Sequence, residues 1–305
     1  MGIKVEQVTK PVLLGEGPHW DADQQCLFYC SIFGHTIHKY VPTTGIETKA
    51  KLSGNVGFVV PVKGTKDQFA VGIDRKVVTV KWDGTDNATA EVLNEVAEVD
   101  AASGFNTNRI NDGKADPKGR LYAGTMGKED PPGSFQQNKG SLFVFSKTGA
   151  EAKADQISIS NGLCWDVTRN VMYYIDSLEY AVRAYDYDFK TGAMTNKRLI
   201  FDYKKNNIVG LPDGMTIDTD GNLWVACFDG SQIIKVDPTK GALLQQVPIP
   251  ALQVTSVAFG GKDLDELYVT SASMNIKGEQ KPPCGATFKV TGLNVKGYAG
   301  DACVL

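Results

Sequence analysis

The residues of this sequence that could do chemistry are oxygen donors placed at similar points along the chain. Glu16 stands between two glycines in VLLGEGPHWD, where a carboxylate is costly to bury unpaired. Asn161 in ISNGLCWD, Asp213 in LPDGMTID, and Asn111 with Asp112 in NRIND are further donors of this kind. Carboxylate and amide oxygens, with no His or Cys among them, suit a hard divalent cation such as Ca²⁺, Mg²⁺ or Mn²⁺. Each Asp or Asn taken alone can equally cap a turn, so the prediction depends on whether the fold brings them together.

An internal repeat supplies the elements that would bring them together. Short β-branched or aromatic stretches, separated by Gly, Asp, Asn and Pro, predict an all-β chain. They recur in groups that contain an apolar strand, a turn with Asp, an aromatic strand, a third strand and a turn ending in Gly. The groups start about 40 to 55 residues apart, the spacing of a four-stranded propeller blade. Six groups fill the chain, starting at Gly17, Gly57, Asp112, Asn161, Asp213 and Thr255.

The repeat predicts a single six-bladed β-propeller domain over residues 1–305, with a metal site at one end of its central channel. Because every innermost strand begins at the same end of such a channel, the oxygen donors at those starts would converge there. The C-terminal segment ATFKVTGLNVKGYAG would supply closing strands near the N-terminal segment, since an open ring leaves sheet edges unpaired. Two packed β-sandwiches are the alternative fold, but they do not explain the repeated motif.

Composition excludes several classes of partner. The chain has 305 residues, of which 42% are hydrophobic and 22% charged, and its net charge of -3 comes without any polybasic patch. We therefore expect neither a nucleic acid nor a membrane as partner. No stretch has the length and apolar character of a signal peptide or a membrane span, so a cytoplasmic location is expected. A ring that closes on itself needs no second subunit, and we expect a monomer or weak dimer.

The cysteines and histidines are expected to play structural parts. The six cysteines include no CxxC pair and are predicted to be free thiols in the core. His35 and His38 have metal-like spacing, but on a strand they would point to opposite faces, so solvent-exposed positions are predicted. His19 is predicted to be a core residue.

A set of longer motifs keeps a regular spacing along the chain: GEGPHWD, NRINDGKADPKGRLYAGTM, ISNGLCWD, MYYIDS, LPDGMTIDTDGNLWVACF, VTSVAFGG and VTGLNVKGYAG. Together they resemble the regucalcin, gluconolactonase and luciferin-regenerating-enzyme-like family, also called the senescence-marker-protein family. The resemblance extends from Glu16 to Gly300 and implies a six-bladed propeller with metal-dependent lactonase activity. One departure is that Cys30 and Ser31 stand where the family has Val-Asp, which we interpret as a local packing change.

The resemblance assigns a metal site to Glu16, Asn161 and Asp213, and makes Asp213 the catalytic acid/base as well. Ca²⁺ is the metal expected first, with Zn²⁺, Mn²⁺ and Mg²⁺ as alternatives. In the expected reaction Asp213 accepts a proton from the attacking water and returns it to the departing ring oxygen.

Three further residues match substrate-contacting positions of the family. They are Arg109 and Asn111 in NRIND and Glu129 in GTMGKED, where the sequence then diverges into KEDPPGSFQQNKG. Arg109 and Asn111 would hold substrate hydroxyls or the developing oxyanion.

The expected activity is hydrolysis of the ester of a sugar (aldono) lactone such as gluconolactone, with the lactone as small-molecule partner. Two alternatives stay open, namely a luciferin-regenerating enzyme acting on oxyluciferin and a non-catalytic calcium-binding regulatory protein. Nearly the same metal residues would serve all three functions. The distinction rests on the loops at the rim of the pocket, residues 128–139 and 274–284, whose sequences do not identify a substrate.

Overall fold

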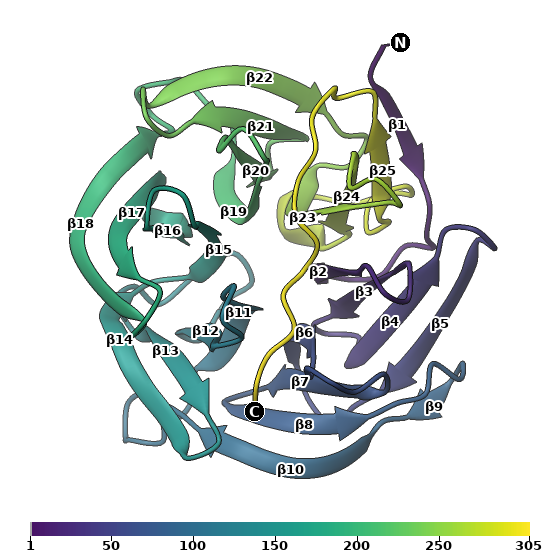
Figure 1. Cartoon of the computed structure of the whole chain (residues 1–305), viewed down its shortest axis with the longest axis vertical. Coiled ribbons are helices and arrows are strands. Elements are labelled where there is room, and N and C mark those ends of the chain that lie inside the picture. The colour runs from purple at the N-terminus through teal and green to yellow at the C-terminus, as the bar shows by residue number, and fades with distance from the viewer. Residues whose placement is uncertain (1) are drawn as a thin grey trace.

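Six antiparallel sheets form a ring around a central channel in the computed structural model, which describes residues 2–305 (Figure 1). The predicted six-bladed β-propeller is therefore confirmed. We number the sheets as blades I to VI in the order of their innermost strands, which begin at Gly15, Val56, Arg109, Ser160, Leu211 and Gln253. These starts lie close to the predicted starts of the repeats.

The first half of the chain forms blades I to III. Blade I contains β2 (Gly15–Asp21), β3 (Cys26–Ser31), β4 (Thr36–Val41), β5 (Ile46–Lys51) and the short parallel strand β9 (Ala88–Thr89). Blade II contains β6 (Val56–Pro61), β7 (Gln68–Ile73), β8 (Lys76–Lys81) and β10 (Glu91–Glu98). Blade III contains β11 (Arg109–Ala115), β12 (Leu121–Met126), β13 (Gly140–Ser146) and β14 (Gly149–Ile157).

The second half forms blades IV to VI. Blade IV contains β15 (Ser160–Asp166), β16 (Val171–Asp176), β17 (Ala181–Asp188) and β18 (Ala193–Asp202). Blade V contains β19 (Leu211–Ile217), β20 (Leu223–Phe228), β21 (Gln232–Asp237) and β22 (Ala242–Pro248). Blade VI contains β23 (Gln253–Gly260), β24 (Glu266–Ala272), β25 (Phe288–Thr291) and β1 (Lys4–Gln7). Two 3₁₀ turns, η1 (Ser177–Glu179) and η2 (Asn275–Lys277), complete the elements; in this described part of the chain no helix is long and apolar enough to cross a membrane.

Burial follows the position of each strand within its blade. The second strands β3, β12 and β16 are buried along their whole length because neighbouring blades cover both of their faces. The outer strands β14 and β18 are largely exposed. The core therefore lies between the blades, as where Phe28 of blade I meets Phe69 of blade II edge to face, with ring centroids 4.8 Å apart.

Each innermost strand is irregular near its start. Its register with the second strand shifts there in all six blades, at Glu16/His19, Val56/Val59, Ile110/Asp112, Asn161/Leu163, Pro212/Met215 and Val254/Ser256. Such bulges change the direction of side chains that would otherwise alternate between the two faces of the strand. Glycines in this region also let neighbouring blades approach closely: a Cβ built on Gly162 would lie 2.7 Å from the carbonyl oxygen of Asp213. The repeated Gly thus brings the starts of adjacent innermost strands together.

The ring closes through the N-terminus. β1 pairs with β25 as the outermost strand of blade VI, so only Phe288–Thr291 of the predicted C-terminal closing segment is a strand. Residues 292–305 instead run as a tail across one end of the channel (Figure 1). Backbone hydrogen bonds attach this tail to blades I, II and III, from Gly300 N to Trp20 O, Cys303 N to Pro61 O and Val304 N to Gly119 O. The tail therefore connects the C-terminal end of the chain to the first three blades, which are distant from it in sequence.

Candidate functional site

The six residues predicted for the site lie together at one end of the channel. They all line a cavity of about 60 Å³: Glu16, Arg109, Asn111, Glu129, Asn161 and Asp213. Five of them stand near the starts of the innermost strands β2, β11, β15 and β19, where the register shifts, and Glu129 lies in the loop after β12. We call this the site end of the channel. The opposite end, crossed by residues 292–305, is the tail end.

Three of the carboxyl groups buried at the site end lie close enough to affect one another's pKa values. Glu16, Asp112 and Asp213 are each only 5% exposed. Burial, followed by the charge of Asp112, raises the pKa of Glu16 to about 8, and burial raises the pKa of Asp112 to about 6. Burial and the charges of Glu16 and Asp112 raise the pKa of Asp213 well above its usual range. The arrangement is therefore unfavourable for several negative charges unless a cation offsets them.

The carboxylate oxygens also have few hydrogen-bond partners. Asp213 Oδ1 is buried and has none among residues 2–305. Glu16 Oε2 accepts from the adjacent Gly17 N at 3.0 Å, and Asp112 Oδ1 from the adjacent Gly113 N at 2.7 Å. Buried carboxyl oxygens with so few partners fit a hard divalent cation, which would favour their ionised form and replace the missing hydrogen bonds.

The amide of Asn161 adds a neutral oxygen to this set. Its Nδ2 donates to Ser177 Oγ at 2.8 Å, which leaves Oδ1 toward Asn111, whose Nδ2 donates to it at 3.2 Å. Within residues 2–305 no group of three or more His, Cys, Asp and Glu side chains is arranged to hold a metal ion. The candidate donor set here instead combines the carboxylates of Glu16 and Asp213 with an amide.

Arg109 lies beside these groups and carries donors toward the cavity. Its Nη1 donates to Asn111 Oδ1 at 2.7 Å and to Ile110 O at 3.3 Å, and its guanidinium lies 5.6 Å from the centre of the Phe33 ring. Because both of these acceptors bind Nη1, the Nε and Nη2 donors are left for a ligand in the part of the chain that the structure describes. Arg109 is thus held in place and still able to bind an anionic or carbonyl oxygen.

Glu129 reaches the cavity from a loop that folds on itself. The backbones of Glu129 and Phe135 form a bridge across residues 128–139, and Glu129 Oε1 accepts from Gly133 N at 2.6 Å. One oxygen of Glu129 therefore supports its own loop.

Several residues of the cavity were not predicted from the sequence. Ser177, which orients Asn161, follows β16 in the motif MYYIDS and is positioned by Asp176, whose Oδ1 accepts from Leu178 N at 3.3 Å and from Ile159 N at 3.0 Å. The Asp-Ser pair at the end of this strand is the signal in the sequence that could have identified Ser177. Apolar side chains at the blade ends form the walls, and no motif marked them: Leu14, Ile32, Met126, Ile159, Leu211 and Phe228.

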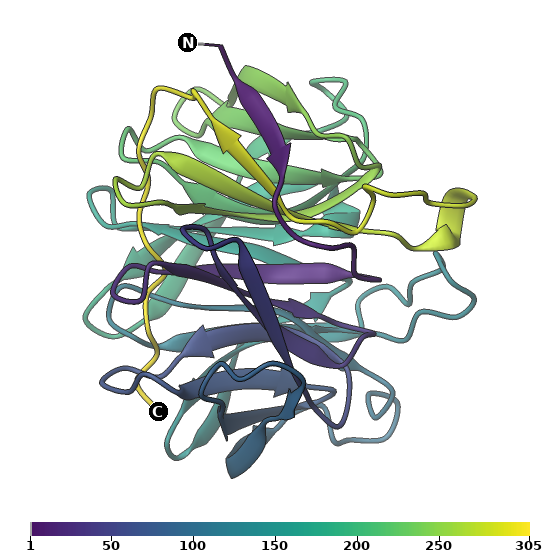
Figure 2. The ribbon, with the colours of Figure 1, turned by 90° about the vertical axis from the view of Figure 1, so that its right-hand side faces the viewer.

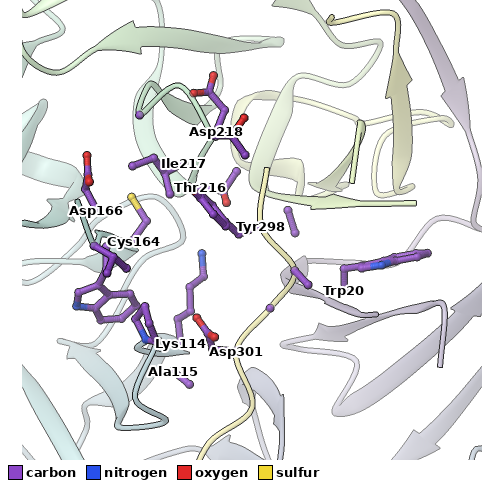
Figure 3. Close-up of a pocket in the computed structure, with 18 of the residues that line it drawn as sticks. Trp20, Lys114, Ala115, Cys164, Asp166, Thr216, Ile217, Asp218, Tyr298 and Asp301 are labelled. Carbon is purple, nitrogen blue, oxygen red and sulfur yellow. The ribbon is translucent and has the colours of Figure 1, made fainter. Parts of the chain in front are cut away.

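A larger cavity of about 770 Å³ lies at the tail end and contains none of the predicted site residues. Figure 3 shows Lys114 near its centre, with Thr216, Tyr298 and Asp301 around it. Lys114 Nζ donates to Met215 O at 2.8 Å. Its size favours this cavity as a ligand site, but the buried carboxyl groups with few partners favour the smaller one. We therefore assign the candidate functional site to the smaller cavity.

The histidine and cysteine predictions have mixed outcomes. His19 is buried, as predicted. The prediction for His38 is wrong: it is buried between Thr36 and Glu47, with its Nδ1 3.1 Å from Glu47 Oε1, because the N-terminal segment covers this face of blade I. All six cysteines are free, and five are buried. Cys30 packs under the site, where its Sγ donates to Glu16 O at 3.4 Å.

Comparison with known proteins identifies relatives along nearly the whole chain. Residues 14–273 match the model of the SMP-30/Gluconolactonase/LRE-like region. Regucalcin from Gallus gallus is 38% identical over 300 residues, covering 97% of this chain and 96% of the relative.

Two solved structures are similar over the full ring. A luciferin-regenerating enzyme is 39% identical, with a TM-score of 0.92 and coverage of 100% of both chains. A calcium-binding protein, regucalcin, from Agrobacterium tumefaciens is 25% identical, with a TM-score of 0.85 and coverage of 99% of this chain and 98% of that one.

Proposed function

This chain belongs to the SMP-30/gluconolactonase/LRE-like family, and from that premise we propose that it is a divalent-metal-dependent lactonase. Its substrate would be a lactone, with sugar lactones such as gluconolactone the first to assay. The family's description, which includes gluconolactonase, supports the reaction type. The observation that carries the proposal is the buried, unpartnered Oδ1 of Asp213 beside the carboxyl groups of Glu16 and Asp112.

Glu16, Asn161 and Asp213 would hold the cation. Two carboxylates neutralise a divalent ion, and the few protein donors leave positions open for water and substrate. Ca²⁺ is proposed first, which agrees with the calcium-binding regucalcin of Agrobacterium tumefaciens. When bound, the ion would supply Lewis acidity to the ester carbonyl.

Asp213 is the proposed acid/base residue. It would take a proton from the attacking water as the water oxygen bonds to the carbonyl carbon, and would give that proton to the ring oxygen as the ring C–O bond breaks. This role requires an ionised Asp213. Burial and neighbouring carboxylates oppose ionisation in the cation-free protein, so Asp213 would act as a base only with the positive charge in place.

Arg109, Asn111 and Glu129 would bind the substrate. The free Nε and Nη2 donors of Arg109 suit the oxygen that gains negative charge during ring opening. Asn111 positions that guanidinium through its Oδ1, and Glu129 keeps one oxygen for a substrate hydroxyl.

The test is a hydrolysis assay on gluconolactone and related lactones with chelator-treated protein reconstituted with Ca²⁺, Mg²⁺, Mn²⁺ or Zn²⁺. We expect turnover only with a divalent ion and its loss in Asp213→Asn. Cation binding without turnover of any lactone would overturn the lactonase proposal and favour a non-catalytic calcium-binding protein. Turnover of oxyluciferin in place of lactones would favour the activity named for the luciferin-regenerating relative.

A further inference from the structure

The walls of the site cavity have a different chemistry from its floor. The floor holds the charged and amide groups, whereas apolar side chains from the blade ends, such as Leu211 and Phe228, form the sides. Two loops complete the cavity: residues 127–139 contribute Phe135, and residues 273–287 contribute Met274 and Ile276. Both loops project from the same side of the ring, opposite the tail (Figure 2).

These two loops meet over the site and are held in defined positions. A Cβ built on Gly133 would lie 2.8 Å from Ile276 Cγ2, so the tip of the first loop touches the second. The side-chain amide of Gln253 holds Met274 at both backbone groups, accepting from its N at 2.9 Å and donating to its O at 3.0 Å. Phe135, Met274 and Ile276 are therefore built into the entrance.

The polar groups of the cavity have little capacity for additional hydroxyls. Asn111 uses both ends of its amide within the protein, Glu129 keeps one oxygen for a hydroxyl, and the free Nε and Nη2 donors of Arg109 are assigned to the oxygen that gains negative charge. Glu16 and Asp213 would be taken by the cation. A polyhydroxylated ligand would thus bury several hydroxyls against apolar walls without partners, which is unfavourable.

From this contrast we propose that the site selects lactones whose ring carries an apolar group, such as an aromatic-fused lactone, over polyhydroxylated sugar lactones. Phe135, Met274 and Ile276 are the specificity residues, and they contact the apolar group while the floor acts on the ester. This inference rests on the proposed lactonase function and names the substrate class for it. An apolar pocket discriminates by about 10- to 100-fold, since it gains from each buried carbon but rejects added hydroxyls only moderately.

The test compares kcat/KM for dihydrocoumarin and glucono-δ-lactone in the Ca²⁺-loaded protein, each divided by its spontaneous hydrolysis rate. We expect the aromatic lactone to be preferred by about tenfold or more. The Phe135→Ser/Ile276→Ser variant should lower kcat/KM for dihydrocoumarin by about tenfold, mainly through KM, and leave the value for glucono-δ-lactone within about twofold. Val209→Ser, at a position 64% exposed and outside the cavity, is the matched control.

The outcomes separate this inference from the function on which it rests. Preference for glucono-δ-lactone in the normalised ratio would overturn the substrate class and leave the lactonase intact. No turnover of either lactone with any metal would remove the lactonase proposal, and the substrate class with it. Should the double variant misfold by circular dichroism, Ile276→Ser alone serves, because Ile276 is half-buried in a loop and contributes little to the core; an unchanged ratio in that variant counts against the inference.

Discussion

Strand β19 has a buried aspartate near its start, Asp213, and is followed directly by another, Asp218, and the two have opposite surroundings. Asp218, at the tail end, is fully buried and saturated: its Oδ1 accepts from Asn222 N at 2.8 Å, and its Oδ2 accepts from Trp224 Nε1 at 3.0 Å and from Lys235 Nζ at 2.9 Å. Asp213, at the site end, has a buried Oδ1 without a partner in the described chain. The two ends of this strand therefore present a paired carboxylate to one end of the channel and an unpaired carboxylate to the other.

The neighbouring innermost strands repeat this contrast. At the tail end, Asp116 after β11 accepts from Arg120 Nη1 at 2.8 Å and from Tyr187 OH at 2.6 Å, and Asp166 of β15 pairs with Arg169. At the site end, the carboxylate of Asp112 in β11 has one partner among residues 2–305, the N of the adjacent Gly113. Residue type and burial alone therefore do not identify a functional carboxylate. The difference is whether the protein itself satisfies the carboxylate: within residues 2–305 the tail-end aspartates have such partners and Asp213 Oδ1 has none, which is why we propose a cation at the site end.

The largest expected effect comes from exchanging these two aspartates for asparagine. Asp213→Asn should lower kcat/KM for lactone hydrolysis by about 10³-fold, because it removes the proposed proton acceptor. It should not lower the free energy of unfolding of the cation-free protein, since burial raises the pKa of the Asp213 carboxyl and leaves its Oδ1 without a partner among residues 2–305, so no stabilising contact of that oxygen is lost. Asp218→Asn should instead lower the free energy of unfolding by about 3 kcal/mol, because it leaves Lys235 without its partner.

Lactone assays and urea unfolding of the two variants measure both quantities. Activity per folded molecule should survive in Asp218→Asn. A variant Asp213→Asn that keeps most of its activity, or loses as much stability as Asp218→Asn, would break the distinction between the two ends.

At the tail end, His19 should make the protein sensitive to acid. Burial lowers the pKa of His19 to about 4, and residue Gly300 of the tail packs directly on its ring. The unfolded chain therefore binds a proton between pH 6.5 and 4 that the folded protein does not, so the contribution of His19 lowers stability as the pH falls through this range, opposite in sign to the contributions of Glu16 and Asp112, whose pKa values are raised. The loss should approach about 3 kcal/mol at pH 4.

Urea unfolding between pH 7 and 4 measures this slope. His19→Phe places an apolar ring that does not titrate at this position and should remove the contribution of His19 to the pH dependence of the free energy of unfolding. His35→Asn, at an exposed turn, should leave that pH dependence unchanged. An equal slope in wild type and His19→Phe would assign the acid sensitivity to other groups.

At the site end, Glu16→Gln should weaken Ca²⁺ binding by about 100-fold, at the upper end of the cost of losing a group that supports a metal site. The fold should survive because Gln has nearly the same shape and replaces a carboxyl group whose ionisation is opposed by burial. Calorimetric titration of the variant measures the affinity. Asp21→Asn, at the other end of the same strand β2, is the matched control and should bind Ca²⁺ as the wild type does.

The repeat made the fold and much of the site predictable. A period of blade length, with Asp- and Gly-containing turns, located the innermost strands near Glu16, Asn161 and Asp213, and the geometry of a propeller then requires these positions to converge. The repeat also marked Asn111, and the resemblance to the family added Arg109 and Glu129 and assigned Asn111 a substrate-contacting role. All six line the same cavity, while their roles as ligands and substrate contacts stay predictions.

The remaining features depend on tertiary contacts that no local pattern encodes. The bulges that orient the site residues depend on how each innermost strand pairs with the second strand of its blade. In addition, an Asp before a turn or a Gly occurs at both ends of β11 and β19, so this sequence pattern does not distinguish the two ends of the channel. Ring closure by β1 was missed because Lys4–Gln7 is short and polar. The apolar rim was missed because its members come from blade ends and loops far apart in the chain.

Ser177 provides the smallest test of the comparison, at a residue to which the sequence assigned no role. It accepts from Asn161 Nδ2 at 2.8 Å and so turns the amide oxygen away from itself. Ser177→Ala frees the amide to rotate and should weaken Ca²⁺ binding by about tenfold with little effect on the fold.

In the same blade, Thr168 donates to Asp166 at 2.6 Å at the tail end, and Thr168→Ala should leave Ca²⁺ affinity unchanged. Equal affinities for wild type and Ser177→Ala would mean that Asn161 is oriented by Asn111 alone, or that it is not a ligand. A loss confined to Ser177→Ala would show that matched hydrogen bonds at the two ends of blade IV support a cation site at one end and only a turn at the other.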